Sequence, residues 1–232
     1  MVPPAELVAL LRSGAVDVAL LPIVELFDDP SLIPLPGMAI GSDGAVRTVK
    51  LLSPVKITAV QNIQLDRESR TSNLLVQMLL AEIYGLDANR IKYVLPQTVD
   101  RTLPRIVIGD KAIADEAAIT LDLGALWKEL TGQPFVYACW MTRDTQNVAE
   151  LTYQLKNCLE KNLRRIPEIC ETLAPHFARW PQSQMIEYLS TNIRYRMGAR
   201  EIEGIRRFHE LLVRHGFMDK PFAWREVHDS AA

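Results

Sequence analysis

The sequence predicts an α/β protein of two lobes, with mixed, mostly parallel sheets flanked by helices and a helical C-terminus. Short apolar runs alternate with segments of helical periodicity up to Met141, and helical periodicity dominates after it. The apolar runs form two groups: one lies before about residue 55 and is completed by Phe135–Met141, and the other lies between. A chain that leaves one lobe, builds a second and returns has this order. We expect lobe I at 1–55 plus 136–232, lobe II at 56–135, and a small-molecule cleft between them.

The first part of the chain predicts one helix and three strands. Three leucines share one face of the opening helix, which Gly14 ends: Leu7, Leu10 and Leu11. An apolar run that stops at Pro22 is typical of a strand covered on both faces. The three strands are expected at Val16–Leu21, Leu32–Ile40 and Ala45–Ser53, the last two joined by the turn-rich Gly41–Gly44.

The remaining elements alternate up to Met141 and are helical afterwards. The strongest helical pattern runs from Thr71 to Tyr84, with apolar residues along one side and Gly85 after its end. A second helix is expected at Leu123–Leu130. Further strands are expected at Ile63–Asp66, Ile91–Leu95, Arg105–Gly109 and Phe135–Met141. Two apolar stripes predict C-terminal helices, namely Val148, Leu151, Leu155, Cys158 and Leu159 in one, and Ile202, Ile205, Phe208 and Leu212 in the other.

Composition and charge exclude several classes of partner. The formal net charge of -2 leaves no basic excess for binding nucleic acid. No run of about 18 apolar residues predicts a membrane span, and the opening MVPPAELVAL has neither the basic segment nor the cleavage pattern of a secretory signal. Three cysteines without CxxC spacing suit a reducing cytosol, and the four histidines lack neighbours at metal-ligand spacing. We expect a cytoplasmic, metal-free protein that binds neither nucleic acid nor membrane.

The segment Asp66–Ser72 is the sharpest candidate site. It lies between a short strand and the strong helix, with the hydroxyls of Ser69, Thr71 and Ser72 at the helix start. The first N–H groups of a helix lack partners within it, so a carboxylate there would gain backbone donors, hydroxyl donors and the favourable end of the helix dipole. Arg70 would add a charge-assisted contact. The alternative is an ordinary Ser/Thr cap, which many helices have.

Two further segments are weaker candidates. Gly109 permits close approach of the backbone at a strand end, and Asp110 would orient a ligand hydroxyl, unless the pair forms a plain turn. Ser42 and Arg47 flank another turn, and Arg47 suits either a carboxylate clamp or a surface ion pair. The sequence contains no motif of hydrolases, kinases or dinucleotide-binding proteins, and no general base is evident in it. The pattern alone predicts a two-lobed binder of small anions, with catalytic residues unassigned.

Eight blocks of sequence follow one another along nearly the whole chain: Ser13–Pro22, Leu35–Ile40, Val46–Val49, Ser69–Ser72, Ile108–Asp110, Leu123–Trp127, Leu130–Val136 and Asn192–Gly198. Each block alone is a weak signal. Together and in this order, they resemble the chorismate dehydratase family of the futalosine route to menaquinone.

The resemblance implies a type II periplasmic-binding-protein-like fold used by a cytosolic enzyme. It implies a lyase that removes water from chorismate, a small-molecule carboxylate, to give 3-[(1-carboxyvinyl)oxy]benzoate. No cofactor is implied, because aromatisation drives the reaction, and the substrate's own enolpyruvyl carboxylate would take the proton. By the same resemblance Ser69, Arg70, Thr71 and Ser72 would hold an anionic group, Gly109 and Asp110 would line the opposite part of the cleft, and Ser42 and Arg47 would be weaker contacts.

One departure from the family leaves alternatives open. The family begins with a strand and a Tyr-Leu-Asn-type segment whose Asn contacts substrate, whereas Met1 of this chain falls almost at the following helix. We expect either a misplaced start codon or a shortened paralogue with altered or no catalysis. A non-catalytic binder of a small aromatic or dicarboxylate ligand is one alternative function. The sister enzyme that forms dihydroxynaphthoate in the same pathway is another.

Overall fold

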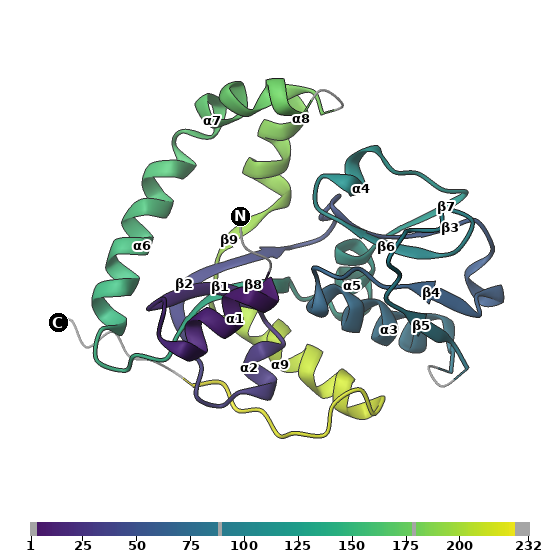
Figure 1. Cartoon of the computed structure of the whole chain (residues 1–232), viewed down its shortest axis with the longest axis horizontal. Helices are drawn as coiled ribbons and strands as arrows, with labels where there is room; N and C mark the ends of the chain where they lie inside the picture. Colours follow the sequence, from purple (N-terminus) through teal and green to yellow (C-terminus); the bar gives the residue numbers. More distant parts are fainter. Residues whose placement is uncertain (1–3, 88–89, 178–179, 226–232) are drawn as a thin grey trace.

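A computed structural model of the chain describes residues 4–87, 90–177 and 180–225. It contains two sheets with helices packed against them, and the chain passes from the first sheet to the second and back (Figure 1). Within these ranges, no helix is both long and apolar enough to cross a membrane. The expected α/β class and helical C-terminal part are confirmed.

The first sheet has the strand order β1-β8-β2-β9, and each pairing in it is antiparallel. Its strands are β1 (Val18–Pro22), β2 (Ile33–Ser42), β8 (Phe135–Thr142) and β9 (Arg194–Arg196). The returning strand β8 therefore lies between β1 and β2. Cys139 and Met141 of β8 belong to the main apolar core, whereas Trp140 packs with Ile33 in a second cluster. Both faces of β8 are thus covered.

The second sheet has the strand order β5-β4-β6-β3-β7. Its strands are β3 (Val49–Ser53), β4 (Asn62–Gln64), β5 (Lys92–Val94), β6 (Arg105–Ile108) and β7 (Ile119–Asp122). Strand β4 is parallel to β5 and β6, and β3 is antiparallel to β6 and β7.

The expectation of mostly parallel strands is wrong. Five of the seven strand pairings in the described ranges are antiparallel. A continuous apolar run indicates that both faces of a strand are covered, but it carries no information about the direction of the neighbouring strand. Strand β8 has the continuous apolar sequence typical of a parallel strand because both of its faces are covered. It is nevertheless antiparallel to both of its neighbours.

The chain crosses to the second sheet before the expected boundary at residue 55. Strand β3 begins at Val49 rather than Ala45 and pairs within the second sheet. Residues 43–48 form the crossing instead of a strand, because the N–H groups of Val46 and Arg47 donate to the carboxylate of Asp122 (3.1 and 2.6 Å). We propose that lobe I is built around the first sheet and lobe II around the second, with crossings at 43–48 and 132–134.

Nine helices accompany the sheets in the described ranges. They are α1 (Pro4–Ser13), α2 (Glu25–Asp28), α3 (Arg70–Tyr84), α4 (Lys111–Ala114), α5 (Leu123–Thr131), α6 (Val148–Leu163), α7 (Ile166–Leu173), α8 (Gln182–Glu187) and α9 (Ala199–Arg214). Short 3-10 turns occupy Ile57–Ala59 and Ala174–His176, and a π-helical turn occupies Tyr188–Asn192. Helix α6 packs against β2 of the first sheet through Val148, Leu151, Leu155 and Leu159, and α7 and α8 follow it along the chain (Figure 1).

One apolar core joins the two sheets through α3, α5 and α9. The ring of Trp127 on α5 lies edge-to-face with Phe135 and Phe208, at centroid distances of 5.1 and 5.9 Å, and its Nε1 donates to the carbonyl of Pro134 (3.1 Å). Gly204 of α9 approaches the same carbonyl so closely that a Cβ there would lie 2.3 Å from it. This packing holds the second crossing in place.

Candidate functional site

Three helices of the second sheet start at the same edge. In the sheet register, Gln64 of β4 pairs with Arg105 of β6, Ile108 of β6 with Val49 of β3, and Lys50 of β3 with Asp122 of β7. The carboxyl ends of β6 and β7 therefore lie beside the first two residues of β3, whereas β4 runs parallel to β6 and ends beside the first residue of β6. Helices α3, α4 and α5 follow the carboxyl ends of these three strands, which run in the same direction, so their N-terminal turns lie toward the side where the chain enters from the first lobe.

The start of α3 has hydrogen-bond donors without acceptors. The Oγ of Ser69 accepts the N–H of Ser72 (3.2 Å) and donates to the Oγ of Ser72 (2.7 Å), which leaves the Ser72 proton free to donate. Thr71 is 1% exposed, and its Oγ1 has no partner in the described part of the chain. The N–H groups of Arg70 and Thr71, at the first two positions of the helix, likewise have no acceptor in these ranges.

The loop before α3 is held by side chains of the same segment. Asn73 accepts the N–H of Asp66 (3.0 Å) and donates to its carbonyl (2.7 Å), and the Asp66 carboxylate accepts the N–H of Glu68 (2.7 Å). Burial raises the pKa of Asp66, against the lowering effect of the Glu68 N–H and of Lys111. This local network fixes the chain on which Ser69 sits, and the part of Asn73 in it was not predicted from the sequence.

Arg70 is not a free cation at this helix start. Its guanidinium pairs with Glu25 (3.2 Å) and with Asp28, both on α2 of the first lobe. Burial alone would lower the pKa of Arg70, but the bonds to these two carboxylates outweigh it and raise the pKa. The ion pairs place α2 against the start of α3, so this turn lies at the junction of the two lobes.

Gly109 and Asp110 lie next to this turn. Gly109 has a φ of 63°, which favours glycine, and its N–H donates to the carbonyl of Thr48 (2.8 Å). Lys111 pairs with Glu68 (3.2 Å) and so connects the start of α4 to the loop before α3. The Lys111–Glu68 pair therefore links the segment after Gly109–Asp110 to the loop before Ser69–Ser72, whereas the resemblance implies opposite parts of a cleft. The Asp110 carboxylate does not cap α4.

Ser42 and Arg47 flank the first crossing, which Asp122 holds. Arg47 has a φ of 68°, a strained value for a residue with a Cβ, and its side chain pairs with Glu187 (3.2 Å). Ser42 is 1% exposed, and its Oγ lies 3.4 Å from the hydroxyl of Tyr137. A Cβ on Gly124 would lie 2.7 Å from that Oγ, so Ser42 is packed against α5. Both side chains therefore make contacts that hold the crossing, and in the described ranges neither bonds to Ser69–Ser72.

Two tyrosines at this edge were not identified from the sequence. The hydroxyl of Tyr188 bonds to the Oγ1 of Thr48 (2.8 Å), and burial together with the nearby Asp110 charge raises its pKa. Burial also raises the pKa of Tyr137 far above its usual range. Both hydroxyls are therefore neutral at physiological pH. Their sequence surroundings are ordinary apolar strand and helix, so no local pattern could have found them, whereas Asp122 before a helix is a recognisable cap.

The groups at the α3 start that lack a partner in the described ranges are hydrogen-bond donors. They are backbone N–H groups and neutral hydroxyls, and no group of three metal-ligating side chains occurs in the described ranges. Donors of this kind, at the positive end of a helix of 15 residues, bind anions. A carboxylate is the group that this arrangement fits.

Comparison with known proteins gives a family. Residues 1–214 match the family model described as menaquinone biosynthesis. A curated chorismate dehydratase of Thermus thermophilus is 28% identical over 90% of this chain and 84% of its own length.

Solved structures with a similar fold include two binding proteins and a protein from a structural genomics programme. A protein of Archaeoglobus fulgidus has a TM-score of 0.66 and 15% identity, over 91% of this chain and 85% of its own. The alkanesulfonate-binding protein of Xanthomonas axonopodis pv. citri, bound to MOPS, has a TM-score of 0.64 and 14% identity, over 96% and 83%. The periplasmic aliphatic sulphonate binding protein of Escherichia coli has a TM-score of 0.59 and 14% identity, over 95% and 82%. The fold is that of the periplasmic binding proteins.

Proposed function

The chain belongs to the menaquinone-biosynthesis family that its sequence matches, and on that premise we propose that it is a carbon–oxygen lyase that dehydrates chorismate to 3-[(1-carboxyvinyl)oxy]benzoate in the futalosine route. The chorismate dehydratase of T. thermophilus supports this choice of reaction. The observation that carries it is at the start of α3, where the buried Thr71 hydroxyl and two backbone N–H groups have no hydrogen-bond acceptor in the described ranges.

The reaction needs positioning more than it needs acid–base groups. The bond between a ring carbon and its hydroxyl oxygen breaks, a neighbouring ring carbon loses a proton, and one water leaves as the ring becomes aromatic. Aromatisation supplies the driving force, so the protein's task is to hold the substrate's carboxylates and orient the leaving hydroxyl. The enolpyruvyl carboxylate of the substrate would take the proton, which agrees with the neutral donors at the α3 start.

We assign one substrate carboxylate to the start of α3. It would accept the N–H groups of Arg70 and Thr71 and the hydroxyl protons of Thr71 and Ser72. Each of these donors lacks another acceptor in the described chain, so binding satisfies them without breaking a bond. Asp110, whose carboxylate caps no helix, would accept a hydrogen bond from a substrate hydroxyl.

Entry of the substrate would require the two lobes to separate at α2. Thr71 and Ser72 are each 1% exposed, so a ligand cannot reach their hydroxyls in this form of the protein. The pairs of Arg70 with Glu25 and Asp28 would hold α2 against the start of α3 in the closed form. Opening and closing about two crossings is the usual motion of such two-lobed proteins.

A second candidate is a binder of a small carboxylate without catalysis. The observation that favours it is the engagement of Arg70, because a guanidinium already paired with two carboxylates is poorly placed to stabilise charge on a reacting substrate. In that case the same helix start would hold the ligand, and no bond would break.

Turnover separates the candidates. The purified chain is incubated with chorismate, and the products are separated by liquid chromatography and weighed by mass spectrometry. A product lighter than chorismate by one water supports the lyase. Thermal stabilisation by chorismate without that product supports the binder. Conversion of the cyclic futalosine-derived substrate to a dihydroxynaphthoate, with chorismate untouched, would reject both in favour of the sister enzyme.

A further inference from the structure

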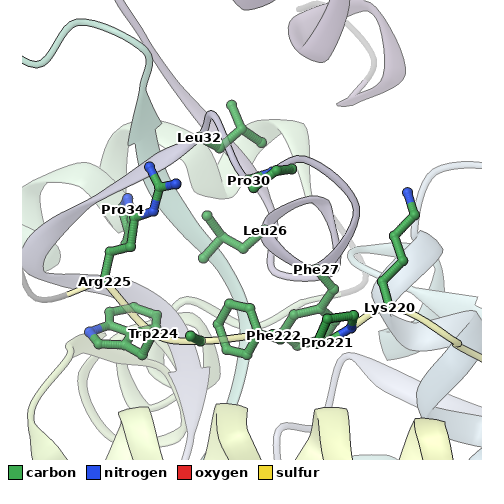
Figure 2. Close-up of a pocket in the computed structure, with 11 residues that line it drawn as sticks. Leu26, Phe27, Pro30, Leu32, Pro34, Lys220, Pro221, Phe222, Trp224 and Arg225 are labelled. Carbon is green, nitrogen blue, oxygen red and sulfur yellow. The ribbon is translucent and has the colours of Figure 1, made fainter.

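A groove on the first lobe is separate from the α3 start. It lies between α2 with its following loop and the segment that follows α9, and its volume is about 340 Å³ (Figure 2). Leu26 and Leu32 form one side, and Phe222 and Trp224 form the other. Ser69–Ser72 are not among its lining residues.

The aromatic side of the groove is anchored to the core. The ring of Phe222 lies 4.8 Å from that of Phe27, at an angle of 67°, and Phe27 also contacts the ring of His209 at 5.0 Å. His209 of α9 is buried and bonds to the carbonyl of Lys220 (2.8 Å). The segment that carries Phe222 and Trp224 is therefore held on both sides, and the groove exists before any ligand binds.

Positive charge lies at the rim of this apolar groove. Arg225 is exposed and pairs with no carboxylate in the described part of the chain, and the Lys220 amine contacts only the carbonyl of Asp28 (3.3 Å). The neighbouring carboxylates are already engaged: Asp29 binds Arg12 and Ser31, and Asp28 binds Arg70. An incoming anion would therefore meet a cation that no carboxylate of residues 4–87, 90–177 and 180–225 neutralises.

We propose that this groove is a second ligand site, which takes a flat, largely apolar molecule with one carboxylate. The rings of Phe222 and Trp224 would contact the body of the ligand, and Arg225 would bind the carboxylate. The volume lies near the lower end of the roughly 300–1,000 Å³ of ligand pockets, which suits a small aromatic acid. Leu26 lies on α2, the helix that also contacts the α3 start, so the two sites share an element.

Trp224 gives a direct readout of this site. Protein labelled with 15N is titrated with trans-cinnamate and, separately, with its neutral analogue trans-cinnamamide, and the indole N–H resonance of Trp224 is followed. The resonance is assigned by its loss in Trp224→Phe. We expect a saturable shift with both probes, with the carboxylate binding more tightly.

Variants test the roles of charge and ring. Arg225→Gln, at an exposed position, should weaken cinnamate about tenfold and change cinnamamide less than about twofold. Phe222→Ala should weaken both probes, whereas Arg206→Gln, an exposed arginine of α9 outside the groove, should weaken neither. Thr71→Val should leave the Trp224 shift unchanged, which separates this site from the α3 start.

Three results would overturn the proposal. The first is a Trp224 resonance that neither probe shifts in a saturable manner. The second is a cinnamate affinity that Arg225→Gln does not lower. The third is a shift that appears on raising the protein concentration alone, with dimer seen by sedimentation, because a second copy would then occupy the groove.

Discussion

Thr71 carries an energetic cost that an anion would remove. Its Oγ1 is buried beside the start of α3 without a hydrogen-bond partner in the described chain. Such a group costs about 1–3 kcal/mol relative to a paired one. A buried group without a partner calls for an explanation, and a ligand that supplies the missing partner is one. The Thr71 hydroxyl should therefore lower the stability of the ligand-free protein and raise its affinity for an anion, and both effects can be measured.

Thr71→Val should stabilise the ligand-free protein by about 1 kcal/mol, because it replaces an unpaired hydroxyl by a methyl group of the same shape. It should weaken chorismate binding by about 1.5–3 kcal/mol, because a donor to a carboxylate is lost. Urea unfolding measures the first effect and titration calorimetry the second.

Thr152→Val is the matched control, since Thr152 on α6 is also buried with an unpaired Oγ1. It should raise stability similarly and leave the affinity for chorismate unchanged. A Thr71→Val protein that binds chorismate as tightly as the parent would remove Thr71 from the site.

For single residues, the sequence was informative for interactions whose two partners are close together in the chain. The hydroxyl of Ser69 caps α3 by accepting the backbone N–H of Ser72, three residues later, which a sequence pattern can predict. The partners of Arg70 are not local: Glu25 precedes it by 45 residues, and only the contact between the lobes brings them together. In place of the charge-assisted contact with a ligand that was expected, Arg70 makes ion pairs within the protein, which no local pattern could predict.

At the scale of elements, α9 and the second crossing are packed without spare room. Gly204 sits on the face of α9 that meets Pro134, and the rings of Trp127, Phe135 and Phe208 surround this contact. Any side chain at position 204 must push α9 away from the crossing, because the group in its path is a backbone carbonyl.

Gly204→Ala should lower the free energy of unfolding by about 1–3 kcal/mol, the range for overpacking a filled core. The gain in helix propensity, up to about 1 kcal/mol, offsets part of the strain. Gly198→Ala at the N-cap of the same helix is the control, because its Cβ would meet only Glu201 Oε2 at 3.5 Å. If urea unfolding finds Gly204→Ala as stable as the parent, the crossing is less tightly packed than described.

Elements with strong internal signals were predicted closely. The helix expected at Thr71–Tyr84 is α3 (Arg70–Tyr84), because a serine cap and Gly85 define both of its ends, and the strand expected at Phe135–Met141 is β8. Strand β7 was missed, since it is short and only partly buried. The strand expected from Ala45 starts late because Asp122, which lies 75 residues after Arg47, captures the backbone N–H groups of the crossing.

At the scale of the whole molecule, charged groups connect the lobes near the crossings. Asp43 pairs with Lys128 of α5 (2.6 Å), Arg194 of β9 (3.1 Å) and Arg200 of α9 (3.3 Å). The hydrogen bond from Lys128 is the main cause that lowers the pKa of Asp43, with further lowering by the two arginines. A hollow of about 460 Å³ opens beside it, lined in part by the π-helical turn. Asp43 thus links α5 to β9 and α9 through its ion pairs.

Because the folded-state pKa of Asp43 lies below its ordinary value of 3.8, its contribution to stability is present above about pH 4 and is lost as the pH falls through the lowered value. Asp43→Asn should therefore cost about 1 kcal/mol near pH 7, a modest figure because its partners are half exposed. The difference from the parent should shrink below pH 4, as urea unfolding at several pH values would measure.

Glu168→Gln removes an exposed carboxylate that pairs with Arg165 within one helix turn, and it serves as the control. It should change stability by less than about 0.5 kcal/mol at any pH. A constant difference between Asp43→Asn and the parent down to acid pH would show that the charge of Asp43 does not hold the lobes.

The backbone amides of Arg70 and Thr71 provide the most direct test of where a carboxylate guest sits. In 15N-labelled protein titrated with chorismate, both amide protons should move downfield together, with a single dissociation constant that matches calorimetry, as each begins to donate to the anion. If chorismate binds while these two amides keep their positions and resonances elsewhere shift, the start of α3 is not its binding site.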